Sequence, residues 1–211
     1  MRKIAVLAII AAGMLALALS GCGSGPSVAK VIDSGYSVEG DHITYVAMVK
    51  NPNEDYYTSY AHVQFSGVDK DGNEVFAAEE IITLDHDTTT AVAGYETLDG
   101  TIAKMDVKVS VEDDAWLQGE LEGECTISDI TEEPDSIGYY DYNYTLHSTY
   151  SSNDVGSLQV TVVLYDKNNK IIGGDYTFDS NYEGTDYKST LPALYTPEHD
   201  HYEFYVIPVS Y

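Results

Sequence analysis

A strand–turn–strand pattern occurs twice in this chain, and this repetition limits the possible folds more than any other feature. Phe65–Val75 reads "FSGVDKDGNEV", and Val162–Ile172, 97 residues later, reads "VVLYDKNNKII". Residues 42–75 align with residues 139–172 without a gap. Before each turn, apolar residues alternate with polar ones, as they do in a half-buried strand. We infer that one small β unit occurs twice.

The alternation also predicts which side chains face the core, because successive side chains of a strand point to opposite faces. In the first unit these are Ile43, Tyr45, Ala47, Val49, Ala61, Val63, Phe65 and Gly67. In the second unit they are Tyr140, Tyr142, Tyr144, Leu146, Leu158, Val160, Val162 and Leu164. Val163 and Tyr165 interrupt the alternation of the second unit.

The two turns carry matching residue types. Asp71-Gly72 and Asn168-Asn169 occupy the same two positions, each preceded by Asp-Lys. A two-residue hairpin turn of the primed type requires positive φ at both positions, which Gly, Asn and Asp tolerate. We therefore expect tight primed turns with positive φ at both residues.

No window shows a helical apolar period, so the chain is expected to be all-β, with two antiparallel β-sandwiches in tandem. Strands are predicted near residues 28–38, 42–50, 60–68, 74–84, 89–97, 104–111, 124–130, 139–147, 157–166, 170–178, 187–191 and 202–209.

The N-terminus has the order of a secretory signal. Arg2 and Lys3 precede the apolar run Ile4–Leu19, which is shorter than the roughly 20 residues that span a membrane. "LSGC", Leu19–Cys22, resembles the lipobox of bacterial lipoproteins. The resemblance implies that residues 1–21 are a cleaved signal peptide and that Cys22 carries the lipid. The chain would then be lipid-anchored on the extracytoplasmic face of the cell membrane, with residues 22–27 as a flexible tether. The alternative is an ordinary signal with a chance cysteine.

A second resemblance lies in the repeated hairpin. "VVLYD", Val162–Asp166, resembles the signature of the FxLYD domain, a bacterial extracytoplasmic module. The second copy has Val162 in place of Phe, and the first copy keeps only Phe65 and Asp69. The resemblance implies immunoglobulin-like sandwiches, over residues 28–117 and 124–211, and brings no catalytic residues. A short acidic hinge, residues 118–123, is then expected to join them into a rod.

The charge excludes one class of partner. The chain has 35 acidic and 10 basic residues, and loss of Arg2 and Lys3 with a signal leaves eight basic ones and a formal charge of −27. Nucleic-acid binding requires basic surface, so no nucleic-acid partner is expected. Cys125 would then be the one remaining cysteine, so the fold is expected to hold together without a disulfide.

Metal and catalytic motifs are weak. Asp69–Glu80 resembles a calcium loop, but the position that requires Gly is Glu74, so a simple turn is favoured. His199 and His201 could form a zinc pair on a strand, but nothing in the spacing supplies further ligands. No motif of a nucleophile elbow, phosphate loop or zinc protease is present. We expect no cofactor, no metal and no enzyme activity, and Cys125 is expected to be a buried thiol.

The nineteen tyrosines are the clearest compositional signal for function. Tyrosine suits contact surfaces for sugar or protein, although it also favours strands. The candidate binding residues are Tyr56, Tyr57, Tyr60 and Tyr182. The predicted role is a non-enzymatic binding or scaffolding module at the cell envelope that recognises a protein or a glycan. The alternatives are a cell-wall hydrolase with a carboxylate pair in a deep pocket, or a spacer without a ligand whose tyrosines are buried.

Overall fold

The computed structural model describes residues 25–119, 121–134, 139–151, 155–180 and 186–209. These residues form strands, with one short 3₁₀ turn, η1 (Asp113–Ala115), and no α-helix among them, so the all-β prediction is confirmed. The first half contains β1 (Lys30–Glu39), β2 (His42–Lys50), β3 (Tyr56–Val68), β4 (Glu74–Leu84), β5 (Thr89–Thr97), β6 (Lys104–Ser110) and β7 (Leu117–Gln118). The second half contains β8 (Cys125–Pro134), β9 (Tyr140–Ser148), β10 (Ser157–Tyr165), β11 (Ile171–Asp179), β12 (Tyr187–Ala193) and β13 (His201–Val209).

The strands form four antiparallel sheets, and the two halves have the same strand order. Sheet I is β1-β2-β5, and sheet II is β4-β3-β6 with β7 paired to β3. Sheet III is β11-β10-β13, and sheet IV is β12-β9-β8. Each strand from β1 to β6 therefore has a counterpart among β8 to β13. Sheets I and II enclose one core and sheets III and IV the other, as in immunoglobulin-like sandwiches.

The predicted core-facing residues lie in these two cores. Phe65 and Val63 are buried between sheets I and II, while Gln64 between them faces outward. Strand boundaries follow the prediction closely, except that β3 begins at Tyr56 and β8 continues to Pro134. Trp116 packs against the first core.

The hairpin turns differ from the predicted type. Only the second residue of each pair, Gly72 with φ +84 and Asn169 with φ +59, has positive φ. Gly72 N–H donates to the Asp69 carbonyl at 3.1 Å, and Asn169 N–H donates to the Asp166 carbonyl at 3.0 Å. The prediction of positive φ at both positions is therefore wrong. The loop is one residue longer, a type I turn followed by a left-handed residue in a bulge.

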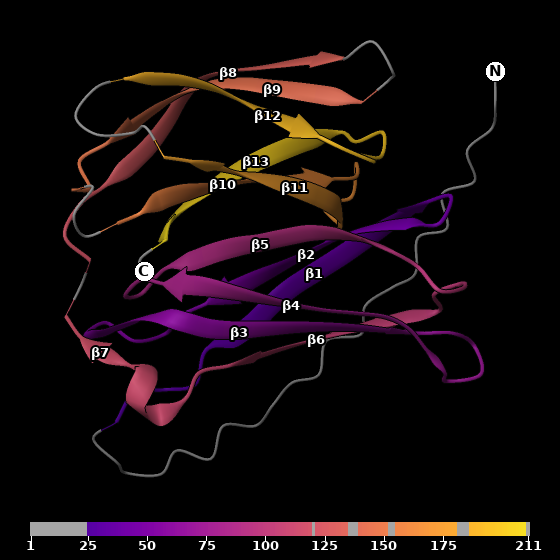
Figure 1. Cartoon of the computed structure of the whole chain (residues 1–211), viewed down its shortest axis with the longest axis horizontal. Helices are drawn as coiled ribbons and strands as arrows, with labels where there is room; N and C mark the ends of the chain where they lie inside the picture. The colour runs from indigo at the N-terminus through magenta and orange to yellow at the C-terminus, as the bar shows by residue number, and fades with distance from the viewer. Residues whose placement is uncertain (1–24, 120, 135–138, 152–154, 181–185, 210–211) are drawn as a thin grey trace.

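The expected rod is also wrong, because the two sandwiches pack face to face. Figure 1 shows the four sheets stacked in the order IV, III, I and II. A third apolar cluster lies between sheets I and III. It consists of Val46, Met48, Ala91, Ala93, Val163 and Ile171, with Tyr165 and Tyr205 packed against it. Val163 and Tyr165, which interrupt the alternation in the sequence, thus belong to the interface between the halves.

Two glycines allow β11 to cross sheet I closely. A Cβ on Gly35 in β1 would overlap the carbonyl oxygen of Ile171. A Cβ on Gly174 would lie 2.7 Å from a methyl group of Val46 and overlap the Val162 carbonyl oxygen. Any side chain at either position would therefore push the sheets apart.

Candidate binding surface

The predicted tyrosines do not form one surface. Tyr56 and Tyr57 are half-buried and pair with Gln118 and Leu117, so they hold β7 against β3. Tyr60 is 56% exposed on β3. Tyr182 lies outside the described residues. Of this set, Tyr60 alone presents a largely open ring within the part that the structure describes.

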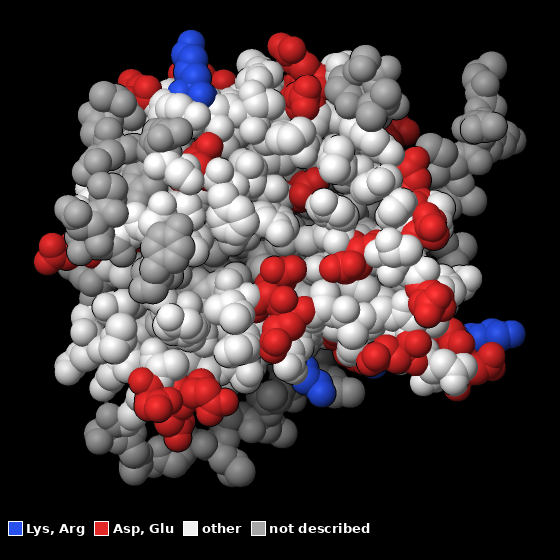
Figure 2. All heavy atoms as spheres, in the orientation of Figure 1, with Lys and Arg blue, Asp and Glu red and all other residues white. Residues whose placement is uncertain are grey.

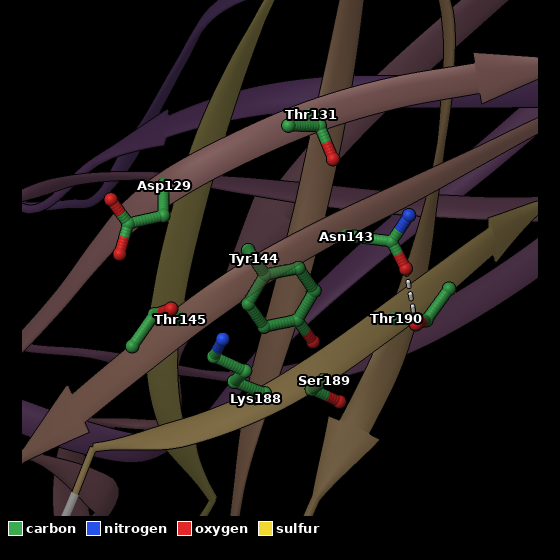
Figure 3. A pocket seen from close by; sticks show the side chains of 8 residues that line it. All are labelled: Asp129, Thr131, Asn143, Tyr144, Thr145, Lys188, Ser189 and Thr190. Atoms are coloured by element: carbon green, nitrogen blue, oxygen red, sulfur yellow. Dashed lines mark hydrogen bonds between the residues drawn. The ribbon is translucent and has the colours of Figure 1, made fainter.

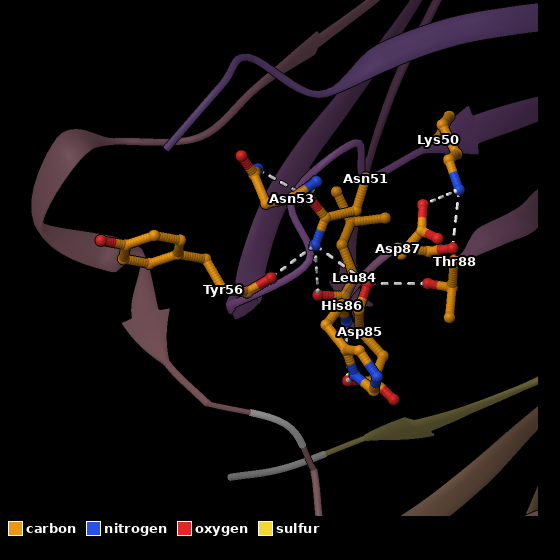
Figure 4. A network of polar contacts seen from close by, with 9 residues as sticks. All are labelled: Lys50, Asn51, Asn53, Tyr56, Leu84, Asp85, His86, Asp87 and Thr88. Carbon is orange, nitrogen blue, oxygen red and sulfur yellow. Dashed lines mark hydrogen bonds and ion pairs between the residues drawn. The ribbon is translucent and has the colours of Figure 1, made fainter. Parts of the chain in front are cut away.

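A polar network fixes the end of the first sandwich next to β7 (Figure 4). The buried side chain of Asn51 donates from Nδ2 to the carbonyls of Tyr56 at 2.8 Å and Asp85 at 2.9 Å. Asn53 accepts from the Ser27 N–H at 2.6 Å and donates back to the Ser27 carbonyl at 2.9 Å. The network joins the first described residues to the β2–β3 and β4–β5 connections, so its groups are occupied by structural contacts.

The calcium-like loop is a turn. Asp69 Oδ1 accepts from the N–H groups of Asp71 at 2.8 Å and Asn73 at 2.9 Å, and Oδ2 accepts from Asn73 Nδ2 at 2.9 Å. These hydrogen bonds, the Asn73 side-chain bond first, lower the pKa of Asp69. Within the described ranges, no group of three His, Cys, Asp or Glu side chains could hold a metal ion.

The two histidines considered as zinc ligands make different contacts. The His199 side chain is 4% exposed, and its Nε2 lies 2.9 Å from Glu132 Oε1 and 3.2 Å from the Tyr142 hydroxyl. Its Nδ1 lies 3.1 Å from the Pro197 carbonyl. His201 instead stacks on Tyr165, with ring centroids 4.9 Å apart. His199 is thus a partnered core histidine.

A shallow hollow lies on the outer face of sheet IV (Figure 3). It is lined by Asp129, Thr131, Asn143, Tyr144, Thr145, Lys188, Ser189 and Thr190. Asp129 is the only carboxylate among them and sits in a bulge with φ +52. Thr190 Oγ1 donates to Asn143 Oδ1 at 2.7 Å. A hydrolase of the predicted kind needs two carboxylates, and this hollow supplies one.

A different group of side chains gathers where the halves meet. We call it the junction patch and define it as Glu80 on β4, Tyr95 and Glu96 on β5, and Tyr176 and Phe178 on β11. Tyr95 is 46% exposed and Phe178 is 52% exposed. The Tyr176 and Phe178 rings meet edge to face, with centroids 5.4 Å apart. Burial raises the pKa of Tyr176, and Glu80, Tyr95 and Glu96 lie close enough to raise it further.

Glu80 anchors the patch to the first core. Its Oε1 accepts a hydrogen bond from the buried Tyr45 hydroxyl at 2.9 Å. Burial raises the pKa of Glu80, and the nearby charge of Glu96 acts in the same direction. The Tyr45 hydrogen bond opposes both effects by stabilising the carboxylate.

More aromatic rings lie along the boundary between the two halves, next to the junction patch. Tyr195, after β12, stacks on His42 with centroids 4.2 Å apart and lies 6.3 Å from Tyr95. Tyr139 meets Tyr195 edge to face at 5.4 Å. The row combines residues from both halves, so it exists only because sheets I and III are docked.

Sequence reasoning missed the junction patch for a physical reason. Its members come from the consecutive strands β4 and β5 of the first half and from β11 of the second half, and their proximity depends on how β11 crosses sheet I. No spacing in the sequence relates Tyr176 to Tyr95 or Glu80. The irregular alternation at Val163 was the one available sign that a second sheet face is covered.

Cys125 packs against the second core but is half-buried, so it is less buried than expected. Burial raises its pKa to about 12, and the nearby Asp179 contributes. Such a thiol is a poor nucleophile.

In comparisons with known proteins, no protein-family model and no curated protein matches this chain. Among the described residues, no helix has the length and apolarity to cross a membrane.

Proposed function

We propose that this chain is a lipid-anchored, non-enzymatic binding or scaffolding protein of the bacterial cell envelope, which recognises a protein or a glycan. The order of charged segment, apolar run and lipobox-like Leu19–Cys22 supports the anchor. The partial FxLYD-like motifs support an extracytoplasmic module. The observation that carries the binding role is the junction patch, where exposed aromatic rings stand beside carboxylates on a rigid pair of sandwiches.

The anchor and the binding role are tested separately. Growth with an alkyne-labelled palmitate should label the full chain and leave the Cys22→Ser variant unlabelled. The soluble Cys22→Ser protein should capture one saturable partner from the native envelope. If the full chain remains unlabelled, the proposed lipid anchor is wrong. If the soluble protein captures no partner, the spacer function replaces the binding function.

One observation favours a second candidate, a cell-wall hydrolase. Glu80 has a raised pKa and Glu96 lies nearby, and glycosidases pair an acid of raised pKa with a second carboxylate. Glu80 already accepts from Tyr45, which favours its ionised form. Turnover of peptidoglycan fragments by the purified protein, abolished by Glu80→Gln, would establish this function in place of binding.

A further inference from the structure

We propose that the junction patch binds a lysine- or arginine-rich segment of a partner protein. The inference rests on the proposed binding function and adds the site and the chemistry of its ligand. The patch brings together two carboxylates, an exposed tyrosine and an exposed phenylalanine from both halves of the molecule. This combination suits a cation with an apolar stem.

The charge of the patch is not balanced by the chain itself. The described residues include eight lysines and no arginine, and none of these lysines belongs to the patch. They are Lys30, Lys50, Lys70, Lys104, Lys108, Lys167, Lys170 and Lys188. Figure 2 shows carboxylates across the middle of one face, over β4 and β5, with a blue lysine directly below them and others at the edges of this view. Among the described residues, the lysine ion pairs involve Asp87 and Asp106 and not Glu80 or Glu96. A partner would therefore supply the cation for these two carboxylates.

The aromatic side chains add a directional contribution. Tyr95 and Phe178 each leave about half of their surface open. Tyr176 contacts the Phe178 ring and is close enough to Glu80 and Glu96 to feel their charge. Guanidinium and ammonium groups are attracted to the faces of such rings, by about 0.5–1 kcal/mol at exposed sites. The methylene groups of Lys or Arg cover apolar surface at the same time.

Partial burial of Glu80 makes the contact stronger than an exposed ion pair. Burial raises the pKa of Glu80, so its carboxylate carries a desolvation cost that a nearby cation would relieve. Exposed pairs contribute little, but partly buried charge contacts are worth more. The net charge of −25 also steers a basic segment toward the surface and repels polyanions.

The test measures binding of a fluorescent oligoarginine peptide to the soluble Cys22→Ser protein by anisotropy. Glu80→Gln/Glu96→Gln is compared with Asp113→Asn/Asp114→Asn in η1, which changes the net charge equally at exposed positions. We expect the patch double variant to weaken binding about tenfold, and the η1 pair to change it less than about twofold. Tyr95→Ala and Glu96→Gln alone, both at exposed positions, should each weaken binding without affecting folding.

Equal weakening by the two double variants would show that net charge alone governs binding, and would overturn the proposal. A second result would also overturn the proposal: oligoarginine fails to bind, whereas a neutral oligosaccharide binds and Tyr95→Ala abolishes that binding. If the patch variants capture an envelope partner as well as the unsubstituted patch does, the proposed binding function is retained and the junction patch is not its site.

Discussion

Tyr45 and Tyr142 occupy equivalent positions 97 residues apart, and each buried hydroxyl donates to a glutamate from a different strand. Tyr45 reaches Glu80 on β4 at 2.9 Å, whereas Tyr142 reaches Glu132 on β8 at 3.2 Å. Glu132 pairs directly with Tyr142 across β8 and β9, whereas the residue that pairs with Tyr45 on β1 is Tyr36, which packs against the first core. Because β1 offers no carboxylate at this position, the Tyr45 hydroxyl donates to β4 instead.

Tyr45→Phe should lower the free energy of unfolding by about 1 kcal/mol, because it removes one buried hydrogen bond and keeps the ring. Tyr142→Phe should have a similar effect. Urea denaturation measures both, with Tyr60→Phe at an exposed position as the neutral control. If Tyr45→Phe is as stable as the control, the hydroxyl does not stabilise the core.

Gly35→Ala should separate or strain the contact between sheets I and III, because the added methyl group meets the Ile171 backbone. We expect destabilisation of about 2 kcal/mol or more, as in overpacked cores. Gly25→Ala, where nothing lies within 4 Å, is the control. Unchanged thermal unfolding of Gly35→Ala would contradict the observed docking.

Asn169→Ala should cost about 1 kcal/mol, since Asn169 has φ +59 and alanine disfavours left-handed backbone. Asn169→Gly should be nearly neutral for the same reason. The comparison of the two variants by chemical denaturation isolates the backbone effect. A loss of equal size in both variants would instead indicate that the asparagine side chain matters.

Asp175 should make stability depend on pH. Asp175 is 3% exposed, and burial raises its pKa from 3.8 to about 6, although its carboxylate accepts from the Leu194 N–H. A carboxyl with a raised pKa binds more protons in the folded state, so its contribution falls as pH rises from about 4 to above 6. The shift corresponds to about 3 kcal/mol across this window.

Asp175→Asn should remove this dependence, even though it loses one hydrogen-bond acceptor and is less stable at low pH. The measurement is the difference in unfolding free energy between pH 4 and pH 7 for the two proteins. A slope that is the same in both would assign the pH dependence to other carboxyl groups.

Cys125 should resist alkylation in the folded Cys22→Ser protein at pH 8, because its pKa of about 12 leaves little thiolate. Iodoacetamide labelling followed by intact mass should show slow modification that becomes fast in denaturant. Rapid labelling without denaturant would indicate that the thiol is accessible and ionised.

Much of the fold could be predicted because strand alternation and turn chemistry are local. The pattern around Phe65 and Val162 identified the repeated hairpins, and the apolar positions fell in the two cores. The docking could not be predicted, because nothing in the sequence marks Gly35 and Gly174 as positions of close approach. Their role is evident only from the crossing of β11 over sheet I. The junction patch follows from that docking, whereas the candidate binding residues Tyr56 and Tyr57 pair with β7.

Sheet I is covered on both faces, by sheet II on one side and by sheet III on the other. If either copy were deleted, the survivor would present a bare apolar sheet to water and would tend to aggregate. Each half therefore depends on the other to keep its outer sheet face out of water, and neither is expected to be soluble as a separate domain.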